Sequence, residues 1–387
     1  MNILTFAAGV EFQFTRGAGT VHSSIPPYVP YVFARAQFGA VNHPNVQGKV
    51  FRTSILQPRL RAFNLKAAMQ QATTGHNRVL LYNGCGGYGD QIMTWPIGQW
   101  LHKAGLAVYI LADPGNDVAW HMFPWVKGLY TLPLQLETLH LFDHHAFFEI
   151  VTNVDDHPGQ SHPVDTMLNQ MGVDPESVEP KYKVVKPYFS AAELNEADNM
   201  FKGQDIAIYQ LHCGSQTRHL LPAESAYLLK TLAERYQNLT WVAVYDSLFG
   251  EPYKNAAAKQ LPKNVSLYRA PAIRQLWALA QRAKVVVAPD SMMVHIAGSL
   301  EIPCVGLWGP THHELRTRYY KHHFPVQCYS ACQWAPCHTY MPNFPQICPP
   351  MPTATITAQR TQCEAMTHIT PDMVTQSVKE ALTVNVG

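Results

Sequence analysis

The sequence predicts an α/β protein with two doubly wound, Rossmann-like domains that face a cleft, preceded by a β-rich N-terminal extension. Three observations lead to this class. The chain has 387 residues, which exceeds the usual size of a single hydrophobic core. From residue 78 onward, short apolar runs typical of buried strands alternate with helical patterns. Glycine turns follow several of these runs, as they do in open parallel sheets.

The expected domains follow from these changes of pattern. Residues 1–77 contain short alternating segments such as 10–14, separated by proline-rich turns, and we expect them to form the β-rich extension. Residues 78–204 are expected to form the first doubly wound domain, and residues 205–387 the second. Scattered prolines and charges at 155–204 indicate the crossing between them. Ligands of such folds bind beyond the carboxyl ends of the strands, so the cleft is the expected site.

Each element of the two domains is predicted from a local pattern. In the first domain, a strand at 79–83 precedes a glycine turn, an amphipathic helix that ends at Gly105, and a strand at 106–113. This order makes a right-handed parallel unit. The second domain repeats the alternation. Its strands are expected at 206–211, 239–247, 284–289 and 303–309, and its helices at 223–237, 274–283 and 292–300.

Composition narrows the function classes. Only 14% of the residues are charged and the formal net charge is +2, with no run of lysines or arginines. This disfavours a dedicated nucleic-acid binder, which would carry a clustered basic surface. The N-terminus lacks the pattern of a signal peptide, and no segment reaches about 18 uninterrupted apolar residues. We therefore expect a cytoplasmic protein without a membrane span.

A glycine loop follows the first predicted strand. Residues 84–89 fit the pattern G-x-G-x-x-G, and Asp113 ends the next strand where a ribose-binding acid would lie, so an NAD-dependent oxidoreductase is an alternative function. Asp90 argues against it, because a carboxylate at the start of the helix repels a pyrophosphate. Asp90 is expected either to cap the helix or to act as a base.

A second constellation follows the predicted strand at 284–289. Asp290 and Ser291 end this strand, and His295 lies about one helical turn further on, so all three could face one ligand. The free N–H groups at the helix start suit a nucleotide diphosphate, and Met292 is expected in the core or in the wall of the site. Arg218 could hold the diphosphate bidentately. Flanking turns contribute further candidates, which are Gly214, Ser215, Gly309, Pro310 and Thr311.

These motifs resemble glycosyltransferase family nine, the heptosyltransferases. Residues 89–96 resemble the opening motif of that family, and residues 290–298 and 303–311 resemble its donor-site signature, within a likeness that covers 78–385. The resemblance implies a GT-B fold with the acceptor side at 78–204 and the nucleotide-sugar side at 205–387.

The resemblance also implies roles for individual residues. Asp90 would be the general base, and Gly89 belongs to the same motif. Asp290, Ser291, Met292 and His295 would hold the nucleotide sugar. Arg218 falls near the family's phosphate-contacting lysine. Met292 replaces the glycine usual in the family, which narrows the space for the donor.

The predicted activity is inverting transfer of a heptose-like sugar from a nucleotide-diphosphate donor, such as an ADP-heptose, to an acceptor hydroxyl. Fixed dipoles can stabilise the leaving group, so we expect neither a catalytic divalent metal nor NAD. A glycan, a protein side chain and a modified DNA base all remain open as acceptors. Besides the oxidoreductase, a non-catalytic nucleotide-sugar-binding or assembly protein is an alternative.

Cysteines crowd the segment 328–363. Four thiols in a long proline-rich loop suffice for a closed tetrahedral site, so we expect structural iron or zinc there. A looser likeness to autotransporter heptosyltransferases implies an extra N-terminal module, a cysteine-bound iron and a homo-oligomer. Cys328 and His338 are substitute ligands. The expected ligands are Cys332, Cys337, Cys348 and Cys363.

Overall fold

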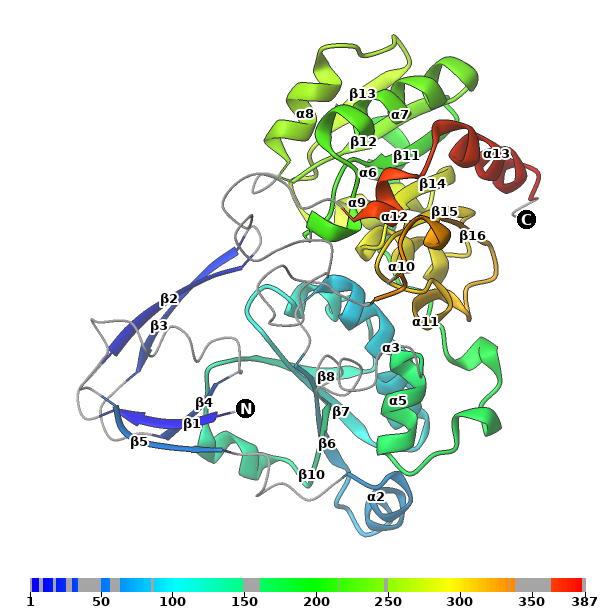
Figure 1. Ribbon diagram of the computed structural model, residues 1–387. Helices are drawn as coiled ribbons and strands as arrows, with labels where there is room; N and C mark the ends of the chain where they lie inside the picture. The colour runs from blue at the N-terminus through cyan, green and yellow to red at the C-terminus, as the bar shows by residue number, and fades with distance from the viewer. Residues whose placement is uncertain are drawn as a thin grey trace. The chain divides into compact units, whose positions relative to one another are not determined.

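The computed structural model divides the chain into two compact units (Figure 1). Unit 1 comprises Met1–Val154 and Pro163–Val185, and unit 2 comprises Asp155–His162 and Lys186–Gly387. The predicted crossing at 155–204 contains this division. The structure describes residues 63–84, 87–148, 161–214, 216–246, 250–333, 335–337 and 363–384, together with the backbone of strands at 2–6, 10–16, 19–25, 30–33 and 50–55.

A parallel four-stranded sheet forms the centre of unit 1. Its strand order is β10-β6-β7-β8, and each pair of neighbours is parallel. The central strand β6 buries every residue after Arg78, as expected for a strand covered on both faces. The strands are β6 (Arg78–Asn83), β7 (Ala107–Ala112), β8 (Val126–Thr131) and β10 (His144–Phe148).

Helix α3 (Tyr88–Lys103) comes after β6 in the chain, with Gly87 as its N-cap. It packs against α5 (Pro163–Gln170) and buries eight consecutive residues from Gln91 to Gly98. Gly105, with φ +87°, turns the chain out of the helix and into β7, a conformation that favours glycine. The predicted helix and its end at Gly105 are therefore confirmed. Helix α2 (Leu65–Ala72) precedes β6.

Antiparallel strands precede this sheet in unit 1. One sheet has the order β5-β1-β4-β9, in which β9 (Leu134–Gln135) comes from beyond β8. A separate hairpin joins β2 to β3. The remaining strands are β1 (Asn2–Phe6), β2 (Val10–Arg16), β3 (Gly19–Ile25), β4 (Pro30–Phe33) and β5 (Val50–Ile55).

Unit 2 contains a six-stranded parallel sheet of order β13-β12-β11-β14-β15-β16. The order reverses between β11 and β14, and this topological switch point is where doubly wound sheets bind ligands. The strands are β11 (Ile206–Gln210), β12 (Thr240–Val244), β13 (Val265–Tyr268), β14 (Ala283–Pro289), β15 (Cys304–Trp308) and β16 (His323–Gln327).

Helices surround the sheet of unit 2. Fully buried tryptophans Trp241, Trp277 and Trp308 come from β12, α9 and β15 and fill the interior. The helices are α6 (Ala191–Met200), α7 (Pro222–Arg235), α8 (Glu251–Ala258), α9 (Ile273–Ala280), α10 (Met292–Ser299), α11 (Glu314–Thr317), α12 (Glu364–Thr367) and α13 (Pro371–Leu382).

The predicted α/β class with parallel sheets is confirmed, and every strand and helix predicted from residue 78 onward is present. The sequence missed β8, β10, β13 and β16, which are the edge strands of the two parallel sheets. β13 has no fully buried residue and β16 has one, so neither shows the continuous apolar run of an interior strand.

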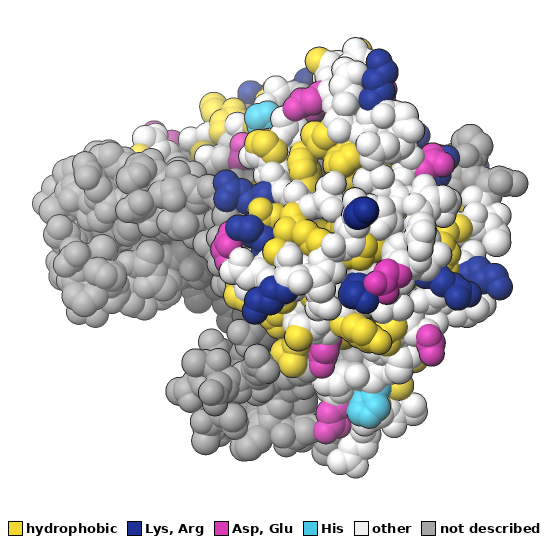
Figure 2. Space-filling view, turned by 90° about the horizontal axis from the view of Figure 1, so that it is seen from above, with side chains coloured by type: hydrophobic (Ala, Val, Ile, Leu, Met, Phe, Trp, Pro, Cys, Tyr) yellow, Lys and Arg dark blue, Asp and Glu magenta, His cyan; other side chains and the backbone are white. Residues whose placement is uncertain are grey.

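The face shown in Figure 2 carries scattered positive charge. On the face shown in Figure 2, the described lysines and arginines lie among acidic and apolar side chains rather than in one continuous stripe. No helix in the described part of the chain is long and apolar enough to cross a membrane.

A buried ion pair in unit 1 joins Asp165 of α5 to Lys183, which lies further along the chain. Lys183 Nζ donates to Asp165 Oδ1 at 2.8 Å, and the two side chains are only 3% and 7% exposed. An ammonium removed from water in this way needs its partner, because an uncompensated charge in the interior is strongly unfavourable.

Lys183→Met is expected to destabilise the protein by about 3–5 kcal/mol, because it leaves the Asp165 carboxylate without its buried cation. Chemical denaturation measures the change. Lys181→Met is the matched control, since Lys181 pairs with Glu179 at 2.8 Å with both side chains more than 60% exposed. An equal loss of stability in the two variants would contradict the assigned role of the buried pair.

Candidate functional site

The carboxyl ends of β11 and β14 meet at the switch point of unit 2. Gln210 ends β11, and Ser291 follows β14 as the N-cap of α10. The Ser291 hydroxyl donates to Gln210 Oε1, so the two strand ends are joined side chain to side chain. Met292 Sδ accepts from Trp277 Nε1 at 3.2 Å, which places Met292 in the wall of this region. Asp290 lies between β14 and Ser291 in the chain.

Asp290 is a buried carboxylate at this point, with 3% of its surface exposed. Its Oδ2 accepts from the Thr311 hydroxyl at 3.0 Å and lies 3.5 Å from Arg218 Nη1. Burial alone raises the pKa of the Asp290 carboxyl, but Arg218 and Arg316 lower it below the ordinary value. The carboxyl is therefore ionised at neutral pH, and three residues predicted for the site lie together.

His295 lies one turn into α10 and is 3% exposed. Burial lowers its pKa to about 4, so the imidazole is neutral at pH 7. Its Nδ1 is 2.8 Å from the hydroxyl of Tyr320. With His295 neutral, one carboxylate and two guanidiniums give this part of unit 2 a surplus of one positive charge, which suits an anionic ligand.

The loop after β15 closes on the same carboxylate. Thr311 reaches Asp290 through its hydroxyl, and its carbonyl accepts from the Tyr329 hydroxyl at 2.6 Å. Gly309 and Pro310 are buried. A Cβ on Gly309 would overlap Met366 and lie 3.3 Å from Cys363 Sγ, so glycine permits the loop to pack on α12 and the residue before it.

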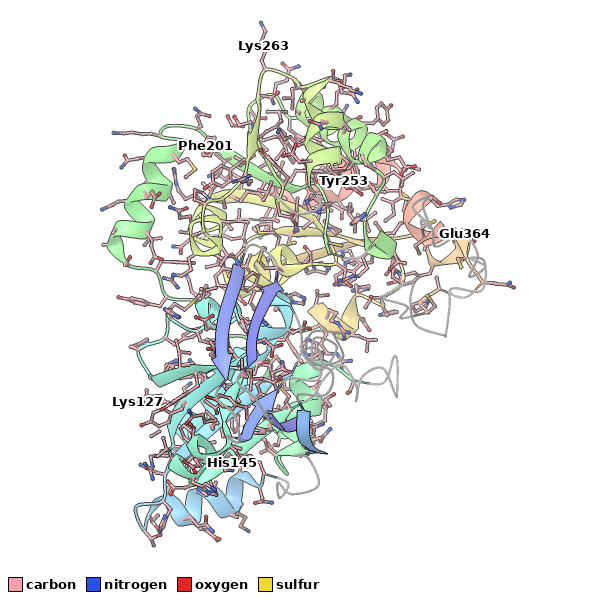
Figure 3. All side chains as sticks on the ribbon, turned by 90° about the vertical axis from the view of Figure 1, so that its left-hand side faces the viewer. Lys127, His145, Phe201, Tyr253, Lys263 and Glu364 are labelled. Carbon is pink, nitrogen blue, oxygen red and sulfur yellow. The ribbon has the colours of Figure 1, made fainter. Side chains whose placement is uncertain are left out.

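Sequence reasoning missed the histidines beside the loop after β11. Tyr253 belongs to α8 (labelled in Figure 3). His212 stacks on its ring with centroids 5.0 Å apart, and His212 Nε2 lies 3.7 Å from Asp246 Oδ2. His219 Nδ1 accepts from the backbone N–H of Cys213 at 3.1 Å. The contacts of His212 join segments far apart in the chain, and no local pattern in the sequence marked them.

Two predicted residues of this loop are not placed in the same way. Gly214 is exposed, and a Cβ added to it would have no atom within 4 Å. Ser215 lies outside the described residues. Arg218 ends the short η7 helix (Gln216–Arg218), and this turn brings its guanidinium to Asp290.

Asp90 occupies the third position of α3 in unit 1. Its Oδ2 accepts from the backbone N–H of Gly87 at 3.0 Å, which is the capping role that its position predicts. The Thr94 hydroxyl donates to the Asp90 carbonyl at 2.8 Å and fixes the same turn. Gly89 lies in the first turn of α3. The loop residues 85 and 86 lie outside the described part of the chain.

Three of the expected metal-binding cysteines, Cys332, Cys337 and Cys363, are free thiols in the structure. Cys348 and His338 lie outside the described residues. Cys332 and Cys363 are buried, whereas Cys337 and Cys328 are partly exposed. Burial raises the pKa of the Cys363 thiol, and Cys337 and Cys332 raise it further, so these thiols are neighbours. Within the described residues, no three His, Cys, Asp or Glu side chains are arranged to hold a metal.

The two parallel sheets make this chain an α/β protein, and the arginines at the switch point of the second sheet suit an anionic ligand. Residues 170–346 match the model of glycosyltransferase family 9 (heptosyltransferase). Within this segment the chain is similar to the family 9 enzymes, and the match supports an enzyme that transfers a sugar from a nucleotide sugar. The resemblance seen in residues 290–298 and 303–311 is confirmed, whereas the opening motif at 89–96 lies outside the matched segment.

Solved structures support the fold. The ADP-heptose lipopolysaccharide heptosyltransferase II of E. coli is 13% identical and has a TM-score of 0.55, covering 79% of this chain and 98% of its own. A family 9 glycosyltransferase from Veillonella parvula is 11% identical, with a TM-score of 0.56 and coverages of 79% and 97%. No curated protein matches the sequence.

A third structure covers more of the chain. The iron-containing dodecameric glycosyltransferase TibC of enterotoxigenic E. coli is 10% identical, with a TM-score of 0.52. The match covers 92% of this chain and 85% of TibC. Similarities at this level of identity show the fold.

Buried neutral histidines make unit 2 sensitive to acid. Burial lowers the pKa of His323 to about 3 and that of His219 to about 4, both below the ordinary 6.5. Between about pH 4 and pH 6.5 the unfolded chain therefore binds more protons than the folded chain. The free energy of unfolding must rise with pH across this window.

His323→Gln is expected to reduce this slope by about 1.4 kcal/mol per pH unit between pH 4 and pH 6. The glutamine carbonyl can still accept from Trp308 Nε1, which His323 Nε2 does at 3.0 Å. Denaturant unfolding at several pH values measures the slope. His368→Gln, at an exposed position of unit 2, is the control and should leave it unchanged. An unaltered slope in His323→Gln would refute the assignment.

Proposed function

We propose that this protein transfers a heptose-like sugar from a nucleotide-diphosphate donor, of the ADP-heptose kind, to an acceptor hydroxyl with inversion at the anomeric carbon. The observation that carries the proposal is the buried Asp290 carboxylate held by Thr311 and Arg218 within the segment matched by the heptosyltransferase model. The structurally similar E. coli heptosyltransferase II is named for ADP-heptose, which supports this donor class.

The donor side of the reaction belongs to unit 2. Arg218 and the N–H groups at the start of α10 stabilise the diphosphate as it takes up charge on leaving. Ser291, Met292, His295 and the loop from Gly309 to Thr311 line the nucleotide sugar, with Gly214 and Ser215 contributing the turn after β11. Because fixed positive groups perform this stabilisation, the reaction needs no catalytic divalent metal and no NAD.

The acceptor side belongs to Asp90. As the acceptor hydroxyl attacks C1 of the sugar, its proton moves to the Asp90 carboxylate while the bond from C1 to the diphosphate oxygen breaks. The transition state has oxocarbenium character. The hydrogen bond from the Gly87 N–H to Oδ2 holds the carboxylate in a fixed orientation for this step. A glycan, a protein side chain and a modified DNA base all satisfy this chemistry.

The wider organisation is also a proposal. The division into a β-rich extension at 1–77, an acceptor domain at 78–204 and a donor domain at 205–387 is supported by the strand content, and the greater coverage of TibC supports a counterpart to the extension. TibC is a dodecamer, which supports a homo-oligomer. A cytoplasmic location stays a prediction.

Structural iron or zinc in the cysteine segment completes the proposal. Buried Cys332 and Cys363 with nearby Cys337 provide the soft thiolate ligands that both metals accept, and Cys348 is the expected fourth. TibC contains iron, which favours iron for this chain. A bound metal would stabilise the chain around Cys363, whose Sγ lies beside Gly309 of the donor loop.

Asp90→Asn is expected to lower the rate of sugar transfer at least about hundredfold, because the amide keeps the cap but cannot accept the proton. Transfer from ADP-heptose is measured, and calorimetry measures ADP binding, which should be unchanged. Asp117→Asn, in the loop after β7, is the control and should retain activity. NAD is included as a competing ligand.

Three results would speak against this assignment. Loss of ADP binding together with activity would reduce Asp90 to a structural cap. Full activity of Asp90→Asn would remove it from the chemistry. Binding of NAD in place of ADP would favour the oxidoreductase.

Cys363→Ser is expected to abolish the bound metal, because it removes a buried thiolate ligand. Elemental analysis of the purified protein should give about one iron or zinc per chain in the wild type. Cys304→Ala, in β15, is the matched control and should keep the metal. A metal-free wild type, or metal retained by Cys363→Ser, would contradict the site.

A further inference from the structure

A partly buried tyrosine, Tyr320, contacts the imidazole of His295 from the side of α11. The Tyr320 hydroxyl lies 2.8 Å from His295 Nδ1, and the two rings meet edge to face with centroids 5.9 Å apart. Tyr320 is placed by the turn that ends α11, where its N–H donates to the carbonyl of Thr317 at 2.8 Å. The contact therefore depends on the chain that follows the donor loop.

A glycine of the family motif makes room for this ring. Gly298 lies one turn after His295 on α10, and a Cβ there would overlap the Tyr320 ring. Any larger residue at position 298 would push the ring away from the helix, and the hydroxyl with it. Gly298 and Tyr320 thus form one packing unit around His295.

The protonation of His295 decides what its second nitrogen can do. A neutral imidazole carries one proton, so one ring nitrogen donates and the other accepts. A phenol hydroxyl is a good hydrogen-bond donor. When the Tyr320 hydroxyl donates to Nδ1 of His295, the single proton of the neutral imidazole must be on Nε2. Within the described residues no other side chain hydrogen-bonds the ring, which leaves Nε2 for a ligand. A diphosphate offers only acceptor oxygens, so the Nε2–H tautomer is the useful one.

We propose that Tyr320 is a positioning residue of the donor site, whose hydroxyl donates to His295 Nδ1 and holds the imidazole in the tautomer that presents Nε2–H to the diphosphate. This inference rests on the proposed function, because it assigns the ligand of Nε2. Tyr320 itself need not touch the donor. It acts through orientation, as a carboxylate or carbonyl does behind a ligating histidine.

The test uses Tyr320→Phe in the full-length protein, because phenylalanine keeps the ring that packs on Gly298 and removes only the hydroxyl. Tyr319→Phe is the matched control on the neighbouring residue, which packs on His162 instead. Two readouts are taken at pH 7.5. Nitrogen-15 NMR of histidine-labelled protein reports the tautomer of His295, assigned with His295→Gln, and calorimetry reports the affinity for ADP.

The wild type is expected to show protonated Nε2 and unprotonated Nδ1 at His295, and Tyr320→Phe a mixture of both tautomers. ADP affinity should fall about tenfold in Tyr320→Phe, the cost of one misoriented hydrogen bond, and stay constant in Tyr319→Phe. A proton on Nδ1 in the wild type would overturn the inference, as would an unchanged tautomer and affinity in Tyr320→Phe.

Failure of the proposed function gives a different result. If the wild type does not bind ADP, the donor assignment is wrong, whereas the NMR signature still decides whether Tyr320 sets the tautomer. Melting temperatures of both phenylalanine variants are measured alongside, and a loss of ADP affinity that follows only the melting temperature also counts against the inference.

Discussion

The buried charge of Asp290 is the constraint on which the second unit depends. A carboxylate with 3% exposure is strongly unfavourable unless it is paired and hydrogen-bonded. The chain meets this requirement from three separate places: the turn after β11 supplies Arg218, the loop after β15 supplies Thr311, and α11 supplies Arg316. Pairing this one carboxylate therefore brings three segments together at the switch point, and two of them, the turn with Arg218 and the loop with Thr311, are expected to hold a nucleotide diphosphate.

The histidines near that carboxylate add no charge to it at neutral pH. Burial keeps His295 and His323 uncharged at neutral pH, so the excess positive charge resides on the two arginines. A neutral imidazole with a fixed tautomer is a directional donor, whereas a guanidinium supplies charge. The imidazole therefore provides orientation and the guanidiniums provide charge. The proposed leaving group, whose negative charge grows during the reaction, would be stabilised by both.

Asp90 shows why a structural role and a catalytic role need not exclude each other. Capping uses one carboxylate oxygen and orients the group, and a base must be held in a fixed orientation to be effective. The cap was predictable from position alone. Whether the carboxylate also accepts a proton depends on what lies beside the acceptor, which the helix pattern does not encode.

The sequence by itself determined the interior strands of both sheets, the helices α3, α7, α9 and α10 and the motif from Asp290 to Gly298, because apolar runs, helical periods and turn residues are local signals. It missed the edge strands β8, β10, β13 and β16, whose half-exposed residues leave no continuous apolar run. Only the tertiary structure decided which distant side chains meet, such as Tyr320 with His295, His212 with Tyr253, and Arg218 with Asp290. Such pairs depend on how separate strands and helices pack against each other. Packing between segments that are distant in the chain produces no local periodic pattern in the sequence.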